Sequence, residues 1–481
     1  MNEPANLLKH SNISDCDGEI ITKEECNNEN NQFYDKDLPY FPGYRENSNK
    51  SLSYRSISEN ALVYNNLSAY NVKPLIAFYQ AKTTYEFLET GLRKRPFILS
   101  RSTALGSGKY AFHWLGDNHS EEDDLKDSIS GIFSFNIFGI PITGSDICGY
   151  RYDSNKKLCL RWYNLGIFYP FMRNHNRKTS INQFPWSFNN DTYGNYDTIN
   201  IIKKNINFRY SLLKYIYSQL FLISLNERGS FFKPVMFEFP NDNSSFEDIE
   251  SKIMFGEAFL VCAFNTVNET EKLFKLPNAN LNEYPSGKII SNYEEEEGEG
   301  KIINLSGKLD MLHVFLRGGF IVPYQNTFDK YILNSLKLRD EKINLIINVN
   351  PWKQCKGIFF FDNDEPNAIG EKKFYKVTLR HLGQRLYFFT DKNSLDKYNY
   401  SDHILGKIEL WRVDKVFESD EGKKKKKKVN YDLKLSYREE LNRTKEHIKG
   451  TYDKINNKAI FEISREDHNI SIFDIDEIRF Y

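Results

Sequence analysis

Residues 144–174, GSDICGYRYDSNKKLCLRWYNLGIFYPFMRN, form the stretch that decides the fold. It begins at the end of one short apolar run, GIPITG at 139–144, and contains a second, GIFYPF at 166–171. Short continuous apolar runs are typical of buried parallel strands. A polar side chain follows each run, Asp146 after the first and His175 after the second. The stretch therefore predicts two parallel strands that end in functional residues.

Two further apolar runs precede this stretch, RPFILS at 95–100 and KYAFHW at 109–114. In a (β/α)8 barrel the catalytic side chains lie at the carboxyl ends of the strands. Four runs in order, each followed by a polar residue, therefore predict one pocket. One spacing departs from a regular barrel, because the gap between the first two polar residues is too short for a helical crossover. The four residues expected at the pocket are Arg101, Asp117, Asp146 and His175.

The side chains at this pocket have the chemistry of a site for a polar ligand. Two carboxylates, an arginine and a histidine are bracketed by Trp114, Tyr150 and Trp162. Aromatic walls around polar groups suit a sugar. The whole chain is rich in aromatic residues, with 30 Tyr and 37 Phe. Such residues also fill the cores of β-domains, so their number alone does not establish a sugar site.

Each pocket residue also has a plainer interpretation when it is taken alone. Asp117 lies in LGDN, which is good turn chemistry, and Asp146 in GSDICG could cap a helix. His175 could be an ordinary hydrogen-bonded histidine, and Arg101 a structural ion-pair donor. The ordered recurrence of four such residues at strand ends favours the pocket.

Composition excludes several classes of protein. Lys and Arg together number 65, as do Asp and Glu, so a nucleic-acid partner is not expected. No run of roughly 18 apolar residues predicts a membrane helix, and the first residues do not resemble a signal peptide. None of the six cysteines shows the CxxC spacing of a zinc site. Eleven Asn-x-Ser/Thr sequons give weak support to a secretory route.

The pattern of apolar and polar residues changes along the chain. Residues 11–60 are polar and predict an irregular segment, whereas the periodicity over 69–95 and again over 209–226 predicts helices. After about residue 235, short β-type runs alternate with polar turns and no further long helix is evident. Two charge runs, EEEEGEG at 294–300 and six lysines at 423–428, are best explained as solvated loops.

The stretch at 144–174 resembles the long signature of glycoside hydrolase family 31, the α-glucosidases. RPFILSRSTALGSGKYAFHWLGDN at 95–118 resembles the segment that carries that family's general acid. RYSLLKYIYSQLF, KPVMFEFPND, MFGEAFLV and FLRGGFIVP continue the resemblance in order, to about residue 325. It implies an α/β fold: the C-terminal half of a (β/α)8 TIM barrel, followed by two β-rich, sandwich-type domains. The expected ranges are 1–235 for the barrel, 236–330 for a proximal and 331–481 for a distal β-domain.

The resemblance also implies a role for each pocket residue. Asp117 matches the acid/base, whereas Asp146 and His175 match residues that hydrogen-bond the hydroxyls of bound glucose. Arg101 matches an arginine at the pocket floor. The aromatic walls are matched by Trp114 and Tyr150. The implied substrate is a carbohydrate with terminal α-linked glucose, and no metal or organic cofactor is implied.

The family's nucleophile lies in the motif Trp-x-Asp-Met-Asn-Glu, and MNEP at residues 1–4 resembles the tail of that motif. The attacking carboxylate is therefore expected one residue before Met1, in sequence that precedes the chain. Retaining hydrolysis requires two carboxyl groups, one that acts as the nucleophile and one that acts as the acid/base. These 481 residues alone are accordingly expected to fold poorly and to leave substrate unchanged.

The resemblance also indicates which branch of the family the chain is similar to. Cys148 and Cys159 match a disulfide of the lysosomal and intestinal members, and RNH stands where the endoplasmic-reticulum branch carries RAH. An oxidising, secretory compartment such as a vacuole or lysosome is then expected. Phe112, Ile167 and Ser145 depart from the usual residues, which leaves substrate preference open. A non-catalytic sugar-binding relative, and a member acting in glycoprotein trimming or on xylosides, remain as alternatives.

Overall fold

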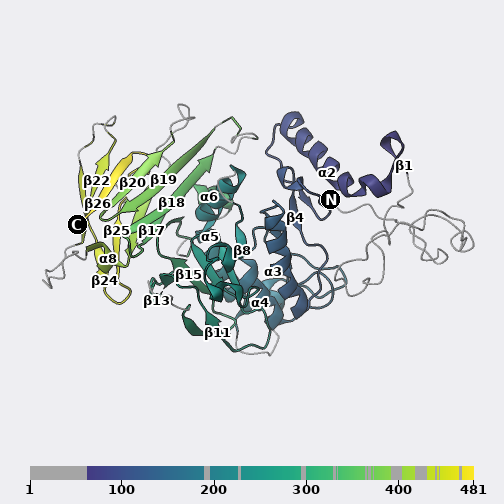
Figure 1. Cartoon of the computed structure of the whole chain (residues 1–481), viewed down its shortest axis with the longest axis horizontal. Coiled ribbons are helices and arrows are strands. Elements are labelled where there is room, and N and C mark those ends of the chain that lie inside the picture. The colour runs from purple at the N-terminus through teal and green to yellow at the C-terminus, as the bar shows by residue number, and fades with distance from the viewer. Residues whose placement is uncertain are drawn as a thin grey trace, which may run out of the picture. The chain divides into compact units, whose positions relative to one another are not determined.

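The computed structural model shown in Figure 1 describes most of the chain from Leu62 onward. The chain divides into two units, Met1–Trp114 and Leu115–Tyr481, which are described separately. The expectations for residues 1–4, 11–60 and 423–428, for most of the acidic run at 294–300, and for Cys16 and Cys26 fall outside the described residues. The structure describes residues 62–188, 196–225, 229–293, 300–328, 332, 334–362, 366, 370–371, 373–391, 403–417, 431–438, 441, 443, 445–464 and 469–481.

The first unit contains the helix predicted over 69–95. Helix α2 spans Ala69–Glu86 and continues into one π-helical turn, η2, at Phe87–Gly91. Two strands follow, β3 at Leu99–Ser100 and β4 at Phe112–Trp114, and they pair in parallel. The connection between β3 and β4 holds a short 3-10 turn, which agrees with a gap too short for a helical crossover. The remaining elements are β1 (Leu62–Val63), η1 (Tyr64–Asn66), β2 (Leu67–Ser68) and η3 (Ser107–Lys109).

The second unit begins with the continuation of the barrel. Strand β6 at Asp146–Ile147 pairs in parallel with β7 at Arg173–Asn174, and the helix α4 at Lys156–Gly166 connects them. The Asn155 side chain starts α4 by accepting a hydrogen bond from the backbone N–H of Leu158. The second predicted helix occurs as two helices that meet at Leu212. The other elements of this part are α3 (Glu122–Ile137), β5 (Thr143–Gly144), η4 (Pro185–Phe188), α5 (Thr198–Ser211) and α6 (Leu213–Ser224).

A six-stranded antiparallel sheet follows, in the order β13-β12-β15-β10-β9-β8. Its central strands are buried along their whole length, which explains their continuous apolar sequences. The strands are β8 (Phe232–Pro234), β9 (Lys252–Phe255), β10 (Phe259–Cys262), β12 (Leu281–Glu283), β13 (Ile289–Ser291) and β15 (His313–Arg317). A separate ribbon pairs β11 (Glu271–Lys275) with β14 (Ile302–Ser306), and two 3-10 turns are η5 (Val235–Phe237) and η6 (Asn243–Phe246).

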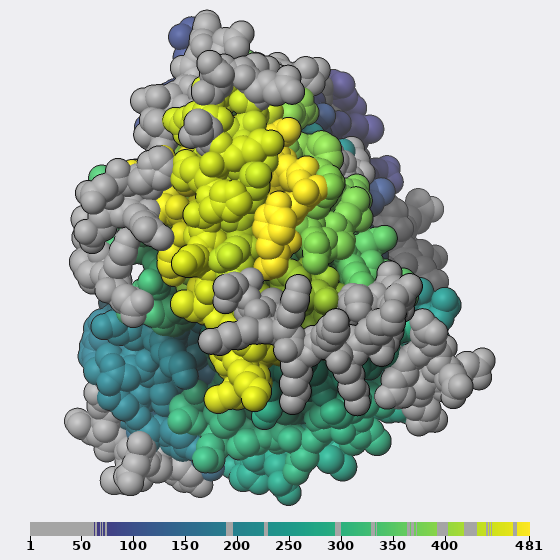
Figure 2. All heavy atoms as spheres, turned by 90° about the vertical axis from the view of Figure 1, so that its left-hand side faces the viewer, coloured from purple at the N-terminus to yellow at the C-terminus, as the bar shows by residue number. Residues whose placement is uncertain are grey.

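An eleven-stranded sheet forms the rest of the second unit, and its C-terminal strands, in yellow, lie in the upper middle of the face seen in Figure 2. Its order is β23-β22-β26-β20-β19-β18-β16-β17-β21-β25-β24. The strands are β16 (Phe320–Tyr324), β17 (Ile343–Asn348), β18 (Gln354–Asp362), β19 (Phe374–Leu382), β20 (Arg385–Thr390), β21 (Leu405–Trp411), β22 (Asp432–Tyr437), β23 (Glu446–Lys449), β24 (Thr451–Asp453), β25 (Lys458–Glu462) and β26 (Ile475–Phe480). Two five-residue helices, α7 (Ser335–Arg339) and α8 (Val413–Phe417), are the only α-helices among the described residues after α6.

The large sheet folds over on itself. Phe461 on β25 and Phe480 on β26 belong to strands far apart in the sheet order, yet their ring centroids lie 5.6 Å apart. Both side chains are buried in one shared core. The sequence prediction of a β-rich, two-layered region is therefore confirmed. The predicted domain boundaries stay predictions, although β16 pairs with strands that lie beyond residue 330.

Helix α6 packs against the large sheet. Phe221 stacks on Phe360 of β18, with 3.3 Å between ring centroids, and the Ser218 hydroxyl accepts a hydrogen bond from the Phe360 N–H at 3.0 Å. The barrel part and the β-rich part of the second unit are thus joined by direct packing. Among the described helices, none is both long and apolar enough to cross a bilayer.

Candidate active site

Asp146 stands at the start of β6 and is completely buried, with 0 % of its surface exposed. Arg173 lies opposite it on β7; its Nε donates to Asp146 Oδ1 at 3.0 Å, and its Nη2 donates to the same oxygen. Within the part of the chain that the structure describes, the second oxygen, Oδ2, is buried and accepts no hydrogen bond. A buried acceptor without a donor is costly, so a ligand hydroxyl that donated to Oδ2 would be favoured.

Burial raises the pKa of the Asp146 carboxyl group. The hydrogen bond from Arg173, the charge of Arg173 and the nearby His175 oppose that increase without cancelling it. The negative charge of Asp117 raises the same pKa further. These effects reach only over short distances, so the two carboxyl groups and the histidine belong to one electrostatic cluster.

Asp117 follows β4 in a turn and is about one third exposed. Gly116 before it has φ of +92°, a conformation that glycine adopts without strain. Arg151 Nη2 lies 4.0 Å from Asp117 Oδ2, and both side chains are partly open to solvent. The chain bends at Asp117 and leaves this carboxylate partly open to solvent, and its role in the pocket stays a prediction.

Tyr150 and His175 stack on one another, with ring centroids 4.9 Å apart and planes 29° apart. The Tyr150 N–H donates to the Asn118 carbonyl at 2.9 Å, and the Arg177 N–H donates to the Tyr150 carbonyl at 2.9 Å. These bonds join the loops that follow β4, β6 and β7. Four of the predicted residues are thus brought together: Asp146 on β6, and Asp117, Tyr150 and His175 on the loops that follow β4, β6 and β7.

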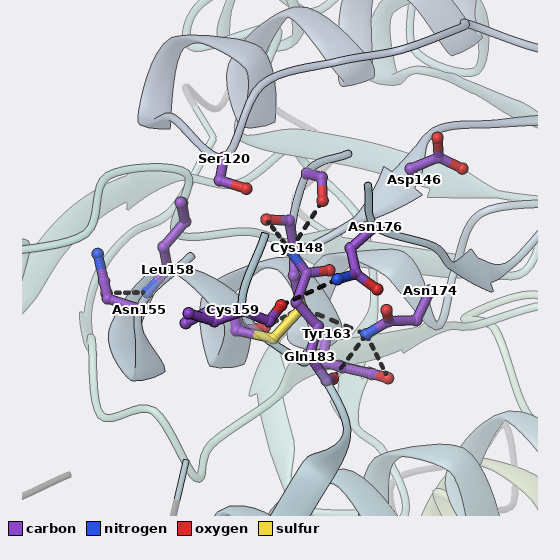
Figure 3. Close-up of a disulfide and its surroundings, with 12 residues drawn as sticks. Ser120, Asp146, Cys148, Asn155, Leu158, Cys159, Tyr163, Asn174, Asn176 and Gln183 are labelled. Atoms are coloured by element: carbon purple, nitrogen blue, oxygen red, sulfur yellow. Dashed lines mark hydrogen bonds between the residues drawn. A yellow bond between two sulfur atoms is a disulfide. The ribbon is translucent and has the colours of Figure 1, made fainter. Parts of the chain in front are cut away.

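A disulfide supports the loop after β6. Cys148 pairs with Cys159 on α4, as the family resemblance implies (Figure 3). Gly149 next to it has φ of +87°, and a Cβ there would come within 2.4 Å of the Ser120 backbone. The loop is therefore held both by a covalent link to the helix and by close backbone approach to the neighbouring loop.

Two amide side chains complete this support, as Figure 3 shows. Gln183 is buried and its Nε2 donates to the Gly149 carbonyl at 2.9 Å. Asn174 Nδ2 donates to the Gln183 carbonyl and to the Tyr163 hydroxyl, each at 3.1 Å. The loop after β7 is in this way tied to the loop after β6.

Arg101 and Trp114 belong to the first unit, where Arg101 follows β3 and Trp114 ends β4. Their predicted roles at the pocket floor and wall stay predictions. Next to Trp114, burial lowers the pKa of His113 to about 4, so that histidine is neutral near pH 7. Trp162 is completely buried in the core on α4, so the sequence interpretation of it as a pocket wall is wrong.

Sequence reasoning missed two residues that organise the cluster. Arg173 precedes Asn174 and His175, and the parallel register of β6 and β7 is the signal that could have identified it as the partner of Asp146. Asn118 Nδ2 donates to Ser145 Oγ at 2.8 Å and to the Asp146 carbonyl at 3.0 Å. The unusual Ser145 therefore has a structural use as an acceptor.

One group in the described residues could supply metal ligands. Donor atoms of His119, Glu121 and Asp124 lie within 4.8 Å of one another. Asp124, however, already accepts a hydrogen bond from the His119 N–H at 2.7 Å, and three acidic residues fill the first turn of α3. Carboxylates at a helix N-terminus stabilise the helix dipole, so a structural role explains this group.

Comparison with known families identifies the chain's class. Residues 1–219 match the glycosyl hydrolases family 31 TIM-barrel domain, and residues 229–322 match the glycosyl hydrolase family 31 C-terminal domain. The chain therefore belongs to glycoside hydrolase family 31.

Relatives and solved structures agree with this assignment. The chain is 31 % identical to intestinal sucrase-isomaltase of Oryctolagus cuniculus over 382 residues, which cover 78 % of the chain and 20 % of that relative. It is 29 % identical to lysosomal alpha-glucosidase of Rattus norvegicus, over 78 % of the chain and 38 % of the relative. The crystal structure of a Tris-bound glucosidase II alpha subunit has the same fold, with a TM-score of 0.74 and 20 % identity over 89 % of this chain and 44 % of that one. The chain thus spans less than half the length of these proteins.

Proposed function

We propose that this chain supplies the acid/base and glucose-binding part of a retaining α-glucosidase that removes terminal α-linked glucose from oligosaccharides or glucans. The observation that carries the proposal is the pair of interacting carboxyl groups, Asp117 in the loop after β4 and Asp146 at the start of β6, in unlike surroundings. Glycosidases need carboxyl groups whose environments give them different tasks. Family membership supports the same reaction class.

The different surroundings of Asp117 and Asp146 indicate a different role for each carboxyl group. Asp146 is buried and its Oδ1 is held by Arg173, so it is suited to accept a hydrogen bond from a sugar hydroxyl and not to move protons. Asp117 is partly exposed and can approach a glycosidic oxygen. In this proposal Asp117 protonates the leaving oxygen, then takes a proton from the incoming water.

The stacked pair Tyr150 and His175 supplies the rest of the sugar contact. The edge of the His175 ring provides a hydrogen-bonding nitrogen, and the Tyr150 ring provides an apolar face beside it. For Arg101 and Trp114 we propose the sugar-contacting roles that the family resemblance implies. The proposal requires no metal or organic cofactor.

We also place the protein in the secretory pathway. The Cys148–Cys159 disulfide supports an oxidising compartment, and a relative is named as a lysosomal enzyme.

The test uses the protein isolated from its source. Glucose release from maltose and from an aryl α-glucoside is measured for the wild type and for Asp117→Asn. The proposal expects turnover by the wild type and its loss in the variant. Binding of a glucose-shaped iminosugar without any turnover by the isolated protein contradicts the enzyme proposal and identifies a sugar-binding relative. Turnover of aryl α-xyloside in preference to α-glucoside contradicts the proposed sugar.

A further inference from the structure

The loop after β7 presents two aromatic side chains to solvent. Phe184 is 51 % exposed and Trp186 is 62 % exposed, although both are large apolar residues. Their rings stack with centroids 4.9 Å apart and planes only 10° apart. The phenyl ring therefore supports one face of the indole and stiffens the pair, which we call the aromatic platform.

The platform is held at a fixed place beside the candidate site. Gln183, the residue before Phe184, donates to the carbonyls of Cys148 at 3.4 Å and Gly149 at 2.9 Å, directly before Tyr150. The Ser187 N–H donates to the Phe184 carbonyl at 2.8 Å and closes a turn around the platform. The platform is thus on the same loop as His175 and is tied to the loop of Tyr150.

A second anchor restrains the middle of this loop. The Ile181 N–H donates to Asp153 Oδ1 at 2.8 Å, and Asn176 Nδ2 donates to the Ile181 carbonyl at 2.9 Å. The segment is therefore fastened to the loop after β6 at Ile181 and at Gln183. A segment fastened in this way presents its aromatic rings in one orientation and pays little entropy on binding a ligand.

We propose that the aromatic platform of Phe184 and Trp186 binds the glucose units that follow the terminal one, so that the preferred substrate is an α-linked oligosaccharide chain longer than a disaccharide. This inference rests on the proposed function. Exposed aromatic faces next to a sugar pocket suit the apolar faces of pyranose rings, which also gain from leaving water. The loop that carries the platform continues directly from His175, which gives a chain leaving the pocket a path to it.

A second exposed tryptophan provides a matched control. Trp352 is 58 % exposed and lies between β17 and β18 of the large sheet, beside Tyr293 at 5.4 Å between ring centroids. It resembles Trp186 in chemistry and exposure, but the turn that carries it belongs to the large sheet and to none of the loops of the candidate site. Its replacement therefore measures the effect of losing an exposed tryptophan as such.

The experiment compares maltose with maltopentaose on the isolated protein. We expect Trp186→Ala to lower kcat/KM for maltopentaose by about 10-fold through KM, because roughly 1.4 kcal/mol of binding energy corresponds to tenfold. The value for maltose should stay within about twofold of wild type. Trp186→Phe, which keeps a ring, should retain most of the effect, and Trp352→Ala should change neither substrate.

Equal losses on both substrates, or the same pattern in Trp352→Ala, would overturn the inference. Loss of a co-purifying protein from Trp186→Ala, with unchanged sugar kinetics, would also overturn it, since the platform would then be a protein-binding surface. If the wild type hydrolyses neither sugar, the proposed function fails. Quenching of tryptophan fluorescence by maltopentaose, present in wild type and reduced in Trp186→Ala, would then still support the platform.

Discussion

Buried carboxylates have different hydrogen-bond and charge partners in the barrel part and in the large sheet of the second unit. In the sheet, Glu409 on β21 accepts from the Tyr324 hydroxyl at 2.7 Å and from the Trp411 indole N–H at 3.2 Å. Lys407 lies 3.1 Å from Glu409 Oε1, and Lys458 lies 3.7 Å from Oε2. Both oxygens are therefore satisfied. In the barrel part, Asp146 has one satisfied oxygen and one buried oxygen with no partner among the described residues.

The pKa values show the consequence of this difference. Burial raises the pKa of Glu409, but the charge of Lys407, the Tyr324 hydrogen bond and Lys458 outweigh it, so the net shift is downward. Burial raises the pKa of Asp146, and Arg173 and His175 do not fully offset it. A fully compensated carboxylate stabilises a fold, whereas an incompletely compensated one is typical of a site that awaits a ligand.

The backbone conformation also differs between the barrel part and the large sheet. Strands of the barrel part are two residues long, and Cys148, Gly149 and Tyr152 in one loop all have positive φ. Strands β18 and β19 of the sheet run for nine residues in regular register. Positive φ also occurs in turns of the sheet, at Lys353, Arg412 and Asn457, so the difference lies in strand length and in the concentration of such residues in one loop. The predictions below test this contrast.

The largest effect is expected at the partly exposed carboxylate of the barrel part. Asp117→Asn removes the proposed proton donor while keeping its shape, so kcat/KM for maltose should fall about 10²- to 10⁴-fold. The measurement is initial-rate kinetics on the isolated protein, with thermal unfolding to show that the variant is folded. Asp340→Asn, at a carboxylate that is largely exposed beside α7, is the matched control and should leave the rate unchanged. A variant as active as wild type would remove Asp117 from the mechanism.

The next largest effect concerns the covalent support of the loop. Replacing Cys148 and Cys159 by alanine should lower the free energy of unfolding by about 2–4 kcal/mol, because the open loop gains freedom in the unfolded chain. Chemical denaturation of wild type and variant, each with and without a thiol reductant, measures the loss. Reductant should destabilise wild type and leave the variant unchanged. A variant as stable as wild type would show that the Gln183 and Asn174 hydrogen bonds hold the loop without the disulfide.

The sequence predicts the polar ends of the barrel part better than the strand order of the sheet. In the barrel part, polar residues follow the run GIFYPF, so the functional end can be inferred, but the strand predicted over 166–171 is wrong: Gly166 ends α4, residues 167–171 form turns and bends, and β7 is Arg173–Asn174. In the sheet, the run GIFFF predicts a strand correctly but does not indicate that β18 pairs in parallel with β16 and antiparallel with β19. Strand order depends on long-range contacts that local patterns do not encode.

Within the candidate site, the grouping of the polar residues was predictable and their supporting contacts were not. Asp117, Asp146, Tyr150 and His175 were all expected at one place, from strand ends and from the family resemblance. The partners Arg173 and Asn118 were missed, because their roles depend on which strand lies beside which. Trp162 was wrongly assigned to the pocket wall. It lies on α4 and is buried in the core, and its spacing from Asp146 in the sequence does not show which side of the helix it occupies.

In the sheet, the sharpest pH effect is expected at His381 on β19. This side chain is completely buried, and burial lowers its pKa to about 4. The unfolded chain takes up the proton near pH 6.5, so stability is lost as pH falls from about 6.5 towards 4, by up to roughly 3 kcal/mol. His381→Leu should remove this part of the loss. Unfolding free energies of wild type, His381→Leu and the exposed-site control His447→Gln at pH 7.5 and pH 4.5 measure it. Equal slopes in all three proteins would contradict the prediction.

The smallest effect compares the two buried carboxylates directly. Glu409→Gln leaves charged lysines without their acceptor and weakens a satisfied network, so it should cost about 2 kcal/mol of unfolding free energy at neutral pH. Asp146→Asn removes a charge whose burial is incompletely offset, so its cost should be under about 1 kcal/mol despite the loss of the Arg173 pair. Denaturant unfolding of the two variants side by side measures the difference. If Asp146→Asn costs as much as Glu409→Gln, then Asp146 is a structural carboxylate of the same kind, and the contrast between the two regions no longer distinguishes a site from a core.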